Sequence, residues 1–264
     1  MSFGERIAIK SRREIQSMRD VGQFTAEILL ELRENAKPGV TTGHLDAIAA
    51  KGLEKRGLNS PFLGYAPGGV APYPAVLCAS INDEIVHGIP GPRELREGDI
   101  ISLDFGVESG GWHGDSAVTI AVGEIDSASS TMKLVETTHE ALDLGIAQMV
   151  PGNRLSDIGH AVESRAEKEG YGVVRQFVGH GIGREMHEPP QVPNYGRPGR
   201  GPRLRAGMVF AIEPMVNAGT EKTKVLEDEW TAVTKDGSLS AHFEHTVLIT
   251  ENGPEVLTRI AGSH

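Results

Sequence analysis

The sequence predicts an α+β protein, a sheet backed by helices, in which one half-domain occurs twice along the chain. Residues 38–57 (PGVTTGHLDAIAAKGLEKRG) align without a gap with residues 151–170 (PGNRLSDIGHAVESRAEKEG). Residues 95–106 resemble residues 204–215, and each copy is a Leu-Arg-x-Gly turn followed by an apolar strand. Two copies are too few for a solenoid, so we expect two halves that close around a shared central site.

Each half is expected to start with a long helix and to continue with the repeated, shorter one. Ser11 and Glu14 form a capping-box pattern at the start of residues 11–36, whose counterpart is residues 130–150. The repeated helices have expected capping residues (Thr42, Ser156) and terminal glycines (Gly57, Gly170). No Pro-, Gly- or Ser-rich linker separates the halves, which span about 11–125 and 129–250.

The composition is that of a globular protein, with 39% hydrophobic and 23% charged residues. A net charge of −10 and a pI near 5.5 disfavour binding to nucleic acid or to an anionic membrane. The sequence shows neither a signal peptide nor an apolar run of bilayer-spanning length. A single cysteine, Cys78, excludes an intramolecular disulfide framework, so we expect a reducing cytoplasm.

Strand alternation brings two aspartates of the first half to one sheet face. In the strand around residues 99–107, Asp104 lies on the face opposite Leu103 and Phe105. If a two-residue turn at Ser109-Gly110 joins this strand to the next, Asp104 faces Asp115 directly, with Cβ atoms ~4.5–5.5 Å apart. Such repulsion requires a shared proton or a divalent cation. The alternative is a different turn with both acids solvated.

The second half repeats this pattern with Glu213 and Glu244, each inside an apolar strand. An acid in that position is unfavourable unless it is paired or bound to metal, and a buried salt bridge is the alternative. Together with His180, which lies between two glycines, the four acids would supply a two-metal site for Mn, Fe, Co or Zn. A water held between two such ions is a nucleophile at neutral pH. His187 is then free to bind substrate or its oxyanion.

Six motifs, taken in order, resemble the type I methionine aminopeptidases over nearly the whole chain. They are CASINDEIVHGIP (78–90), SLDFG (102–106), GWHGDSA (111–117), GHGIGREMHEPPQVPNY (179–195), AIEPMV (211–216) and SLSAHFEHT (238–246). The resemblance implies the pita-bread fold, α+β, with two pseudo-symmetric halves and a central antiparallel sheet backed by helices. It also implies that residues 1–264 form a single catalytic domain.

The resemblance implies a role for each matching position. The family's metal ligands fall on Asp104, Asp115, His180, Glu213 and Glu244. Asp115 and Glu244 would bridge the two ions, and Glu213 would also be the general base. The catalytic histidines would be His87, near the peptide amine and the scissile bond, and His187, which contacts the substrate carbonyl. The methionine pocket would be formed by Tyr65, Tyr73, Cys78 and Trp230.

The implied activity is removal of the initiator methionine from nascent polypeptides by metal-activated water attack on the first peptide bond. A small second residue would be favoured. The expected partners are peptide N-termini that begin with methionine and, transiently, the ribosome, although no basic docking patch is evident in the sequence. We expect neither DNA nor a membrane as a partner, and we expect a cytoplasmic monomer.

Three features distinguish this chain from other branches of the fold. The stretch from Tyr65 to Pro74 is longer than the family's usual Tyr-Pro turn, so residues 66–72 are expected to alter the pocket rim. No cysteine-rich N-terminal extension is present, as in the short bacterial form. Only 26 positions separate His187 from Glu213, too few for the type II insertion.

Two other functions are weighed against this one. A proline-handling peptidase of the same fold usually carries an additional N-terminal domain, for which 264 residues leave no room. A non-catalytic binding protein of this fold would have lost metal ligands, whereas all five are present here. Activity on Met-Ala but not on Xaa-Pro peptides would exclude the proline-handling peptidase. Retention of metal by the purified protein would argue against the non-catalytic binding protein.

Overall fold

The computed structural model describes residues 7–259. Its helices are α1 (Arg12–Asn35), α2 (Thr42–Arg56), α3 (Ser130–Ala147) and α4 (Leu155–Lys168), with a 3₁₀ turn η1 (Pro67–Gly69). Its strands are β1 (Cys78–Ile81), β2 (Glu84–Val86), β3 (Ile100–Ser109), β4 (Trp112–Ala121), β5 (Gly172–Val173), β6 (Gly179–Gly181), β7 (Glu188–Val192), β8 (Val209–Ile212), β9 (Met215–Asn217), β10 (Thr223–Val225), β11 (Ala232–Thr234), β12 (Ser240–His242), β13 (Glu244–Thr250) and β14 (Gly253–Val256). None of the helices in this part of the chain is long and apolar enough to span a bilayer.

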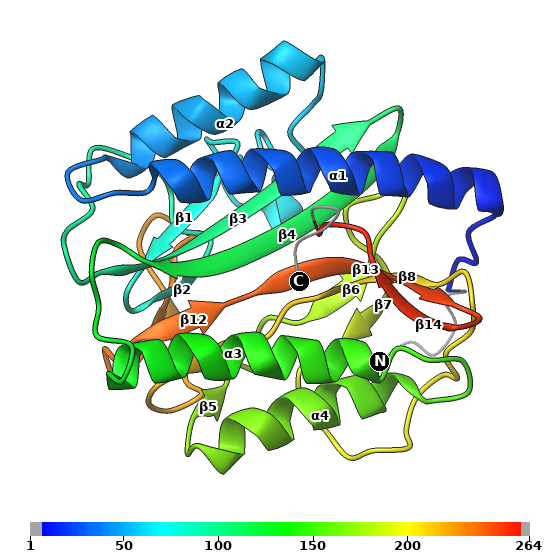
Figure 1. The fold of residues 1–264 in the computed structure, drawn as a ribbon. Helices are drawn as coiled ribbons and strands as arrows, with labels where there is room; N and C mark the ends of the chain where they lie inside the picture. Colours follow the sequence, from blue (N-terminus) through cyan, green and yellow to red (C-terminus); the bar gives the residue numbers. More distant parts are fainter. Residues whose placement is uncertain (1–6, 260–264) are drawn as a thin grey trace.

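One large antiparallel sheet contains strands from both halves of the chain. Its order is β1-β3-β4-β13-β8-β6-β7, with β14 also paired to β13. The first three strands come from the first half and the other four from the second, so the halves meet where β4 pairs with β13. Two three-stranded sheets, β10-β11-β2 and β12-β9-β5, complete the structure. Figure 1 shows α1 and α2 above these strands and α3 and α4 below them.

Both helix pairs pack against the same face of the large sheet. Under α1 and α2, the buried side chains of Met18 and Ile28 pack in a cluster with Phe105 of β3. Under α3 and α4, Leu134 packs in a cluster with Ile212 of β8. The pairing register carries this face from Phe105 through β4 and β13 to Ile212. The opposite face of the sheet is therefore not covered by these four helices.

The helix ends agree with the sequence in part. The capping box at Ser11 and Glu14 is present, and Gly57 ends α2 in the left-handed conformation with φ 63°. The N-cap of α2 is Thr41, however, and not the expected Thr42, which is buried inside the first turn.

The expectation that Ser156 caps α4 is also wrong. The N-cap is Arg154, and its backbone N–H donates to the carboxylate of Asp157 at 2.7 Å. Ser156 instead lies in the first turn of the helix, and its hydroxyl accepts a hydrogen bond from Arg200 N at 2.7 Å.

The hairpin between β3 and β4 has a different register from the one predicted. Ser109 pairs with Trp112, so the two turn residues are Gly110 and Gly111, with φ 59° and 75°. A two-residue hairpin turn of this kind needs positive φ at both positions, and a Ser109-Gly110 turn would have placed serine there. Asp104 therefore lies opposite Ala117 and not opposite Asp115.

Glu213 and Glu244 lie at the ends of strands and not inside continuous ones. Glu213 directly follows β8, and the strand expected around Glu244 divides at Phe243 into β12 and β13. Phe243 N donates to the carbonyl of Pro214 at 3.3 Å. Pro214 has no N–H for a sheet ladder, so pairing is interrupted beside both glutamates.

The turn geometry predicts the effect of a single substitution. Among residues 7–259 no atom lies within 4 Å of a Cβ built at Gly110, so only backbone strain opposes a side chain there. Gly110→Ala should lower the free energy of unfolding by roughly 1–2 kcal/mol, because alanine disfavours the left-handed region. Gly110→Asn should lower it less, since asparagine tolerates this conformation. Urea unfolding of both variants measures the difference, and an alanine variant as stable as wild type would contradict the turn assignment.

Candidate metal centre and substrate pocket

Four of the five predicted ligands point out of the sheet face that the helices leave open. Asp104 and Glu244, on the two strands that flank β4, both lie opposite Ala117, so they share its face. Asp115 lies two residues before Ala117 and points the same way. The pairing of β6 with β8 brings His180 to this face as well. Register alone therefore gathers side chains that are far apart in the sequence.

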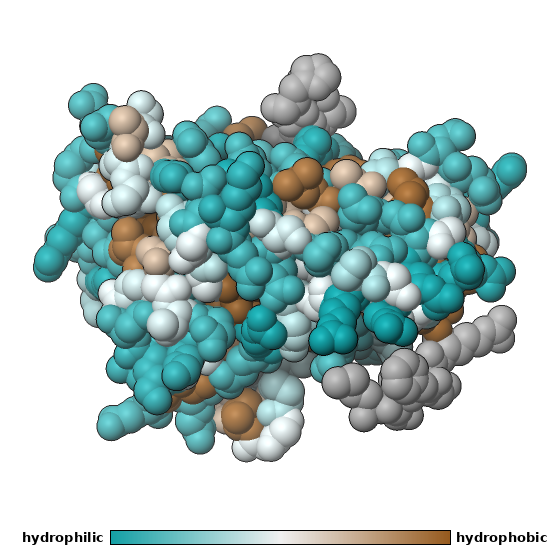
Figure 2. Space-filling view, turned by 90° about the horizontal axis from the view of Figure 1, so that it is seen from below, coloured by the Kyte–Doolittle hydropathy of each residue, from teal (hydrophilic) through white to brown (hydrophobic). Residues whose placement is uncertain are grey.

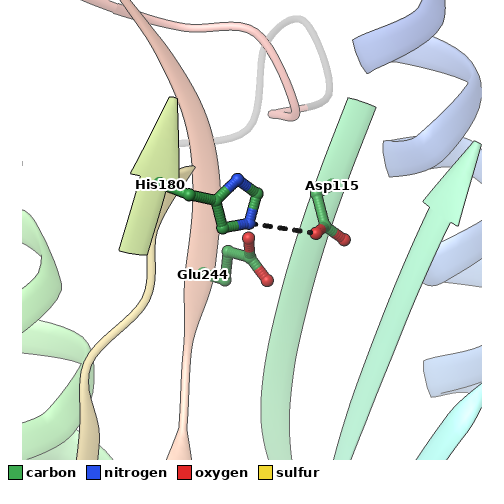
Figure 3. Close-up of side chains that lie close together, drawn as sticks. All are labelled: Asp115, His180 and Glu244. Atoms are coloured by element: carbon green, nitrogen blue, oxygen red, sulfur yellow. Dashed lines mark ion pairs between the residues drawn. The ribbon is translucent and has the colours of Figure 1, made fainter. Parts of the chain in front are cut away.

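The side chains of Asp115, His180 and Glu244 converge from three strands, as Figure 3 shows. One ligand atom from each lies within 4.8 Å of the others. His180 Nε2 is 3.9 Å from Asp115 Oδ2 and 3.4 Å from Glu213 Oε1. Glu213, just beyond the end of β8, thus joins the same cluster.

The carboxylates lack the partners that buried charges need. Asp115 and Glu244 are 4% and 2% exposed. Asp104, Asp115 and Glu244 each have one buried oxygen with no hydrogen-bond partner among the residues that the structure describes. Unpaired buried carboxylates are strongly unfavourable, so the cluster needs positive charge from outside the chain.

The electrostatics of the cluster point in the same direction. Burial, with a further contribution from Asp115, raises the pKa of Asp104 and of Glu213 well above the usual range for carboxyl groups. Burial and the same neighbour raise the pKa of Glu244. Each carboxylate therefore resists ionisation beside the others, and a bound dication would reverse this preference.

His180 has the orientation of a nitrogen ligand. Burial and the nearby His187 lower its pKa to about 3, so the ring is neutral near pH 7. Its Nδ1 lies 2.9 Å from the carbonyl of Gly181, which fits a protonated Nδ1 that donates this bond. The lone pair of Nε2 then faces the carboxylates. Oxygen donors with one imidazole suit a divalent transition metal, and the residues present fit such an ion.

The cluster forms one end of a pocket of about 290 Å³. All eleven residues that the sequence singled out line this pocket: Tyr65, Tyr73, Cys78, His87, Asp104, Asp115, His180, His187, Glu213, Trp230 and Glu244.

An aromatic wall lies beside the carboxylates. Tyr73, Cys78 and Trp230 are buried in one cluster, against which Phe62 packs. The Tyr73 ring packs edge-on against the Trp230 ring, with the ring centroids 5.1 Å apart. Trp230 Nε1 donates to the carbonyl of Ala71 at 2.8 Å, so its polar group is satisfied and its ring is held in place. The wall is therefore preformed.

Two further histidines lie next to the ligands. The ring centroid of His187 is 4.3 Å from that of His180, and its Nδ1 lies 3.2 Å from the Tyr65 hydroxyl. His87 has a positive φ of 61° and meets the Phe177 ring edge-on at 5.4 Å. Burial and His187 lower the pKa of His87 to about 4, so it is neutral near pH 7. Backbone strain of this kind collects at functional sites.

The loop 66–72 contributes one lining residue, Pro67, to the pocket. Gly64 N donates to Tyr73 O, and Tyr73 N donates to Tyr65 O, each at 2.8 Å, which closes the loop at its base. Within the loop, Ala71 accepts the bond from Trp230 described above.

Eight further residues line the pocket, and of these only Pro67 belongs to a stretch that the sequence had assigned to the pocket, the loop 66–72. Among the seven that were missed, His242 is the most unusual. It is 2% exposed, and both ring nitrogens lack a partner among residues 7–259. Its position two residues before Glu244 was the available signal. Phe62 and Phe177 also line the pocket, and nothing in their sequence neighbourhood marked them.

In comparison with known proteins, both the sequence and the fold match one family. Residues 16–251 match the model of metallopeptidase family M24. A methionine aminopeptidase of Clostridium acetobutylicum is 52% identical over 253 residues, 96% of this chain and 98% of the relative. The crystal structure of a methionine aminopeptidase from Thermotoga maritima superposes with a TM-score of 0.91 at 46% identity, covering 96% of this chain and all of the other.

A prolidase from Pyrococcus horikoshii shares the fold alone. It matches with a TM-score of 0.75 at 22% identity, over 95% of this chain and 63% of the prolidase. These matches confirm the expected fold, an α+β pita-bread architecture with an antiparallel sheet backed by helices.

The unpaired carboxylates predict metal-dependent stability. Adding Mn²⁺ or Co²⁺ at about 1,000 times Kd to chelator-treated protein should stabilise it by about 4 kcal/mol, seen as a rise in Tm. Asp115→Asn should not gain this rise, because a ligand and a negative charge are lost together. Glu54→Gln, on the exposed side of α2, is the matched control and should respond like wild type. An equal rise in Asp115→Asn would place the metal elsewhere.

Proposed function

This chain belongs to metallopeptidase family M24, and we propose that it is a methionine aminopeptidase that removes the initiator methionine from polypeptides with a small second residue. The observation that carries the proposal is the pocket itself, in which an aromatic wall with a thiol adjoins a carboxylate–imidazole cluster. An unbranched thioether suits such a wall, and the free α-amine and first peptide bond would then lie at the cluster.

Two divalent ions, of Mn, Fe, Co or Zn, are the proposed cofactor. They would be held by Asp104, Asp115, His180, Glu213 and Glu244, with Asp115 and Glu244 shared between them. When bound, such ions supply an acidified water as nucleophile and polarise the scissile carbonyl. Four carboxylates offset the charge of two dications, which supports two ions over one.

Three side chains of the site would handle protons and orient the substrate. Glu213, whose Oε1 faces His180, would take the proton of the attacking water and pass it to the leaving amine. His187 would donate a hydrogen bond to the scissile carbonyl as negative charge develops on its oxygen. His87, held edge-on against Phe177, would contact the substrate near the scissile bond.

Selectivity is proposed to come from the walls and the rim. Tyr65, Tyr73, Cys78 and Trp230 would surround the methionine side chain. Tyr65, beside His187 at the rim, and the loop 66–72 would restrict the space for the second residue. This arrangement supports a preference for a small side chain after the cleaved bond.

The remaining features of the proposal concern the whole chain. We propose a single catalytic domain whose repeats span about 11–125 and 129–250, acting as a cytoplasmic monomer that meets nascent chains and, transiently, the ribosome. The sheet formed jointly by both halves supports one domain. Figure 2 shows hydrophilic side chains over most of one face, with apolar residues in small separate spots.

The activity is tested directly with a Met-Ala-Ser peptide. Chelator-stripped protein should release no methionine, and adding back Mn, Fe, Co or Zn should restore release with at least one ion. A Met-Pro peptide and an Ala-Pro peptide separate this activity from that of a proline-handling peptidase. Cleavage confined to the Xaa-Pro peptides, or none by folded metal-loaded protein, would contradict the proposal.

The role of His187 predicts a kinetic signature. His187→Ala should lower kcat about 10²- to 10³-fold with little change in KM, because a hydrogen bond to the developing oxyanion strengthens in the transition state. His160→Ala, at an exposed position on α4, is the control and should leave both constants unchanged. Steady-state kinetics on Met-Ala-Ser measures both constants. A loss confined to KM would show that His187 binds substrate without acting in the transition state.

A further inference from the structure

A buried ion pair lies outside the metal cluster, close to His187. Lys10, in the segment before α1, has its Nζ 2.5 Å from Glu188 Oε2, and the two side chains are 5% and 13% exposed. The pair between Arg19 and Glu255 is similarly short at 2.6 Å, but its side chains are 41% and 36% exposed. Burying an ammonium is unfavourable unless its partner is well placed, so this pair constrains where both residues can lie.

The other oxygen of Glu188 holds the turn that carries His187. Residues 183–187 form the bend between β6 and β7. Glu188 Oε1 accepts a hydrogen bond from Arg184 N at 2.6 Å, and Glu185 N lies 3.4 Å away. The carboxylate of Glu188 therefore accepts hydrogen bonds from the backbone of the turn and also pairs with Lys10 of the N-terminal segment. A Cβ at Gly183 would collide with Lys10 Nζ and Glu188 Oε1, so a side chain at this position would displace the ion pair.

The opposite side of the turn is fixed by the β3–β4 hairpin. His113 N donates to the carbonyl of Gly183 at 2.9 Å. The guanidinium of Arg184 lies 3.9 Å above the Trp112 ring and donates to the carbonyl of Gly111 at 3.2 Å. The turn at residues 183–187 is therefore in contact with the N-terminal segment on one side and with the β3–β4 hairpin on the other.

Successive side chains of an extended segment point to opposite sides. Glu188 points toward Lys10, and His187 points into the pocket, beside His180 and Tyr65. We propose that Lys10 and Glu188 form a clamp that positions His187 for reaction, an inference that rests on the proposed function. Lys10 and Glu188 touch no substrate in this account; they are positioning residues that act through the backbone of the turn.

The clamp is tested with Lys10→Met, Glu188→Gln and the double variant, with Arg19→Met as the control for loss of an exposed ion pair. Lys10→Met should lower kcat on Met-Ala-Ser about tenfold while KM changes little, because small misplacement of a catalytic group weakens transition-state contacts. The double variant should lose little more than either single variant, since both remove one device. Lys10→Arg should restore most of kcat, and Arg19→Met should match wild type.

A second readout does not depend on activity. In metal-free protein, backbone amides of residues 183–188 should exchange hydrogen faster in Lys10→Met than in wild type, while amides of β3 exchange at unchanged rates. If wild type releases no methionine, the proposed function fails, and this exchange comparison still tests the clamp. A Lys10→Met variant with wild-type kcat and wild-type exchange in the turn overturns it. A lower Tm with kcat and turn exchange unchanged also overturns it, because the pair would then only stabilise the fold.

Discussion

Mutual repulsion among buried carboxylates is the constraint on which the rest of this structure depends. Asp104, Asp115 and Glu244 lie on the sheet face without helices, where Glu213 joins them from beyond the end of β8, and three of the four keep an oxygen unpaired among the described residues. A chain gains nothing in stability from such an arrangement by itself. The pocket therefore makes physical sense as a cation site, and its neutral imidazoles and aromatic wall are organised around that charge.

Both parts of the chain contribute side chains to this site. Asp104 and Asp115 come from the β3–β4 hairpin, whereas His180, Glu213 and Glu244 come from the second part of the chain, so neither part has a complete ligand set. Pairing of β4 with β13 joins the halves and brings Asp115 of the first half beside Glu244 of the second. Two further contacts join distant parts of the chain near this site: Lys10 pairs with Glu188 at the start of β7, and Trp112 packs against Arg184 in the turn before it.

Much of the fold and the site could be predicted because side-chain alternation is a local property. The faces of Asp104 and Glu244 follow from the strand pattern alone. Register is less local: the turn at Gly110-Gly111 moved every pairing of the hairpin, and Asp104 and Asp115 became neighbours on one face without lying opposite each other. The break at Phe243 depends on Pro214, and the pairing of Lys10 with Glu188 spans most of the chain, so no local pattern could reveal either.

The central claim is that five side chains from both halves form one dinuclear centre. Anomalous diffraction from crystals grown with Mn²⁺ tests it most directly, because it locates each ion without reference to activity. The account predicts two anomalous peaks about 3.5–4 Å apart, contacting Asp104, Asp115, His180, Glu213 and Glu244. Ordered Mn²⁺ bound only at other positions, with the carboxylate cluster empty, would contradict it.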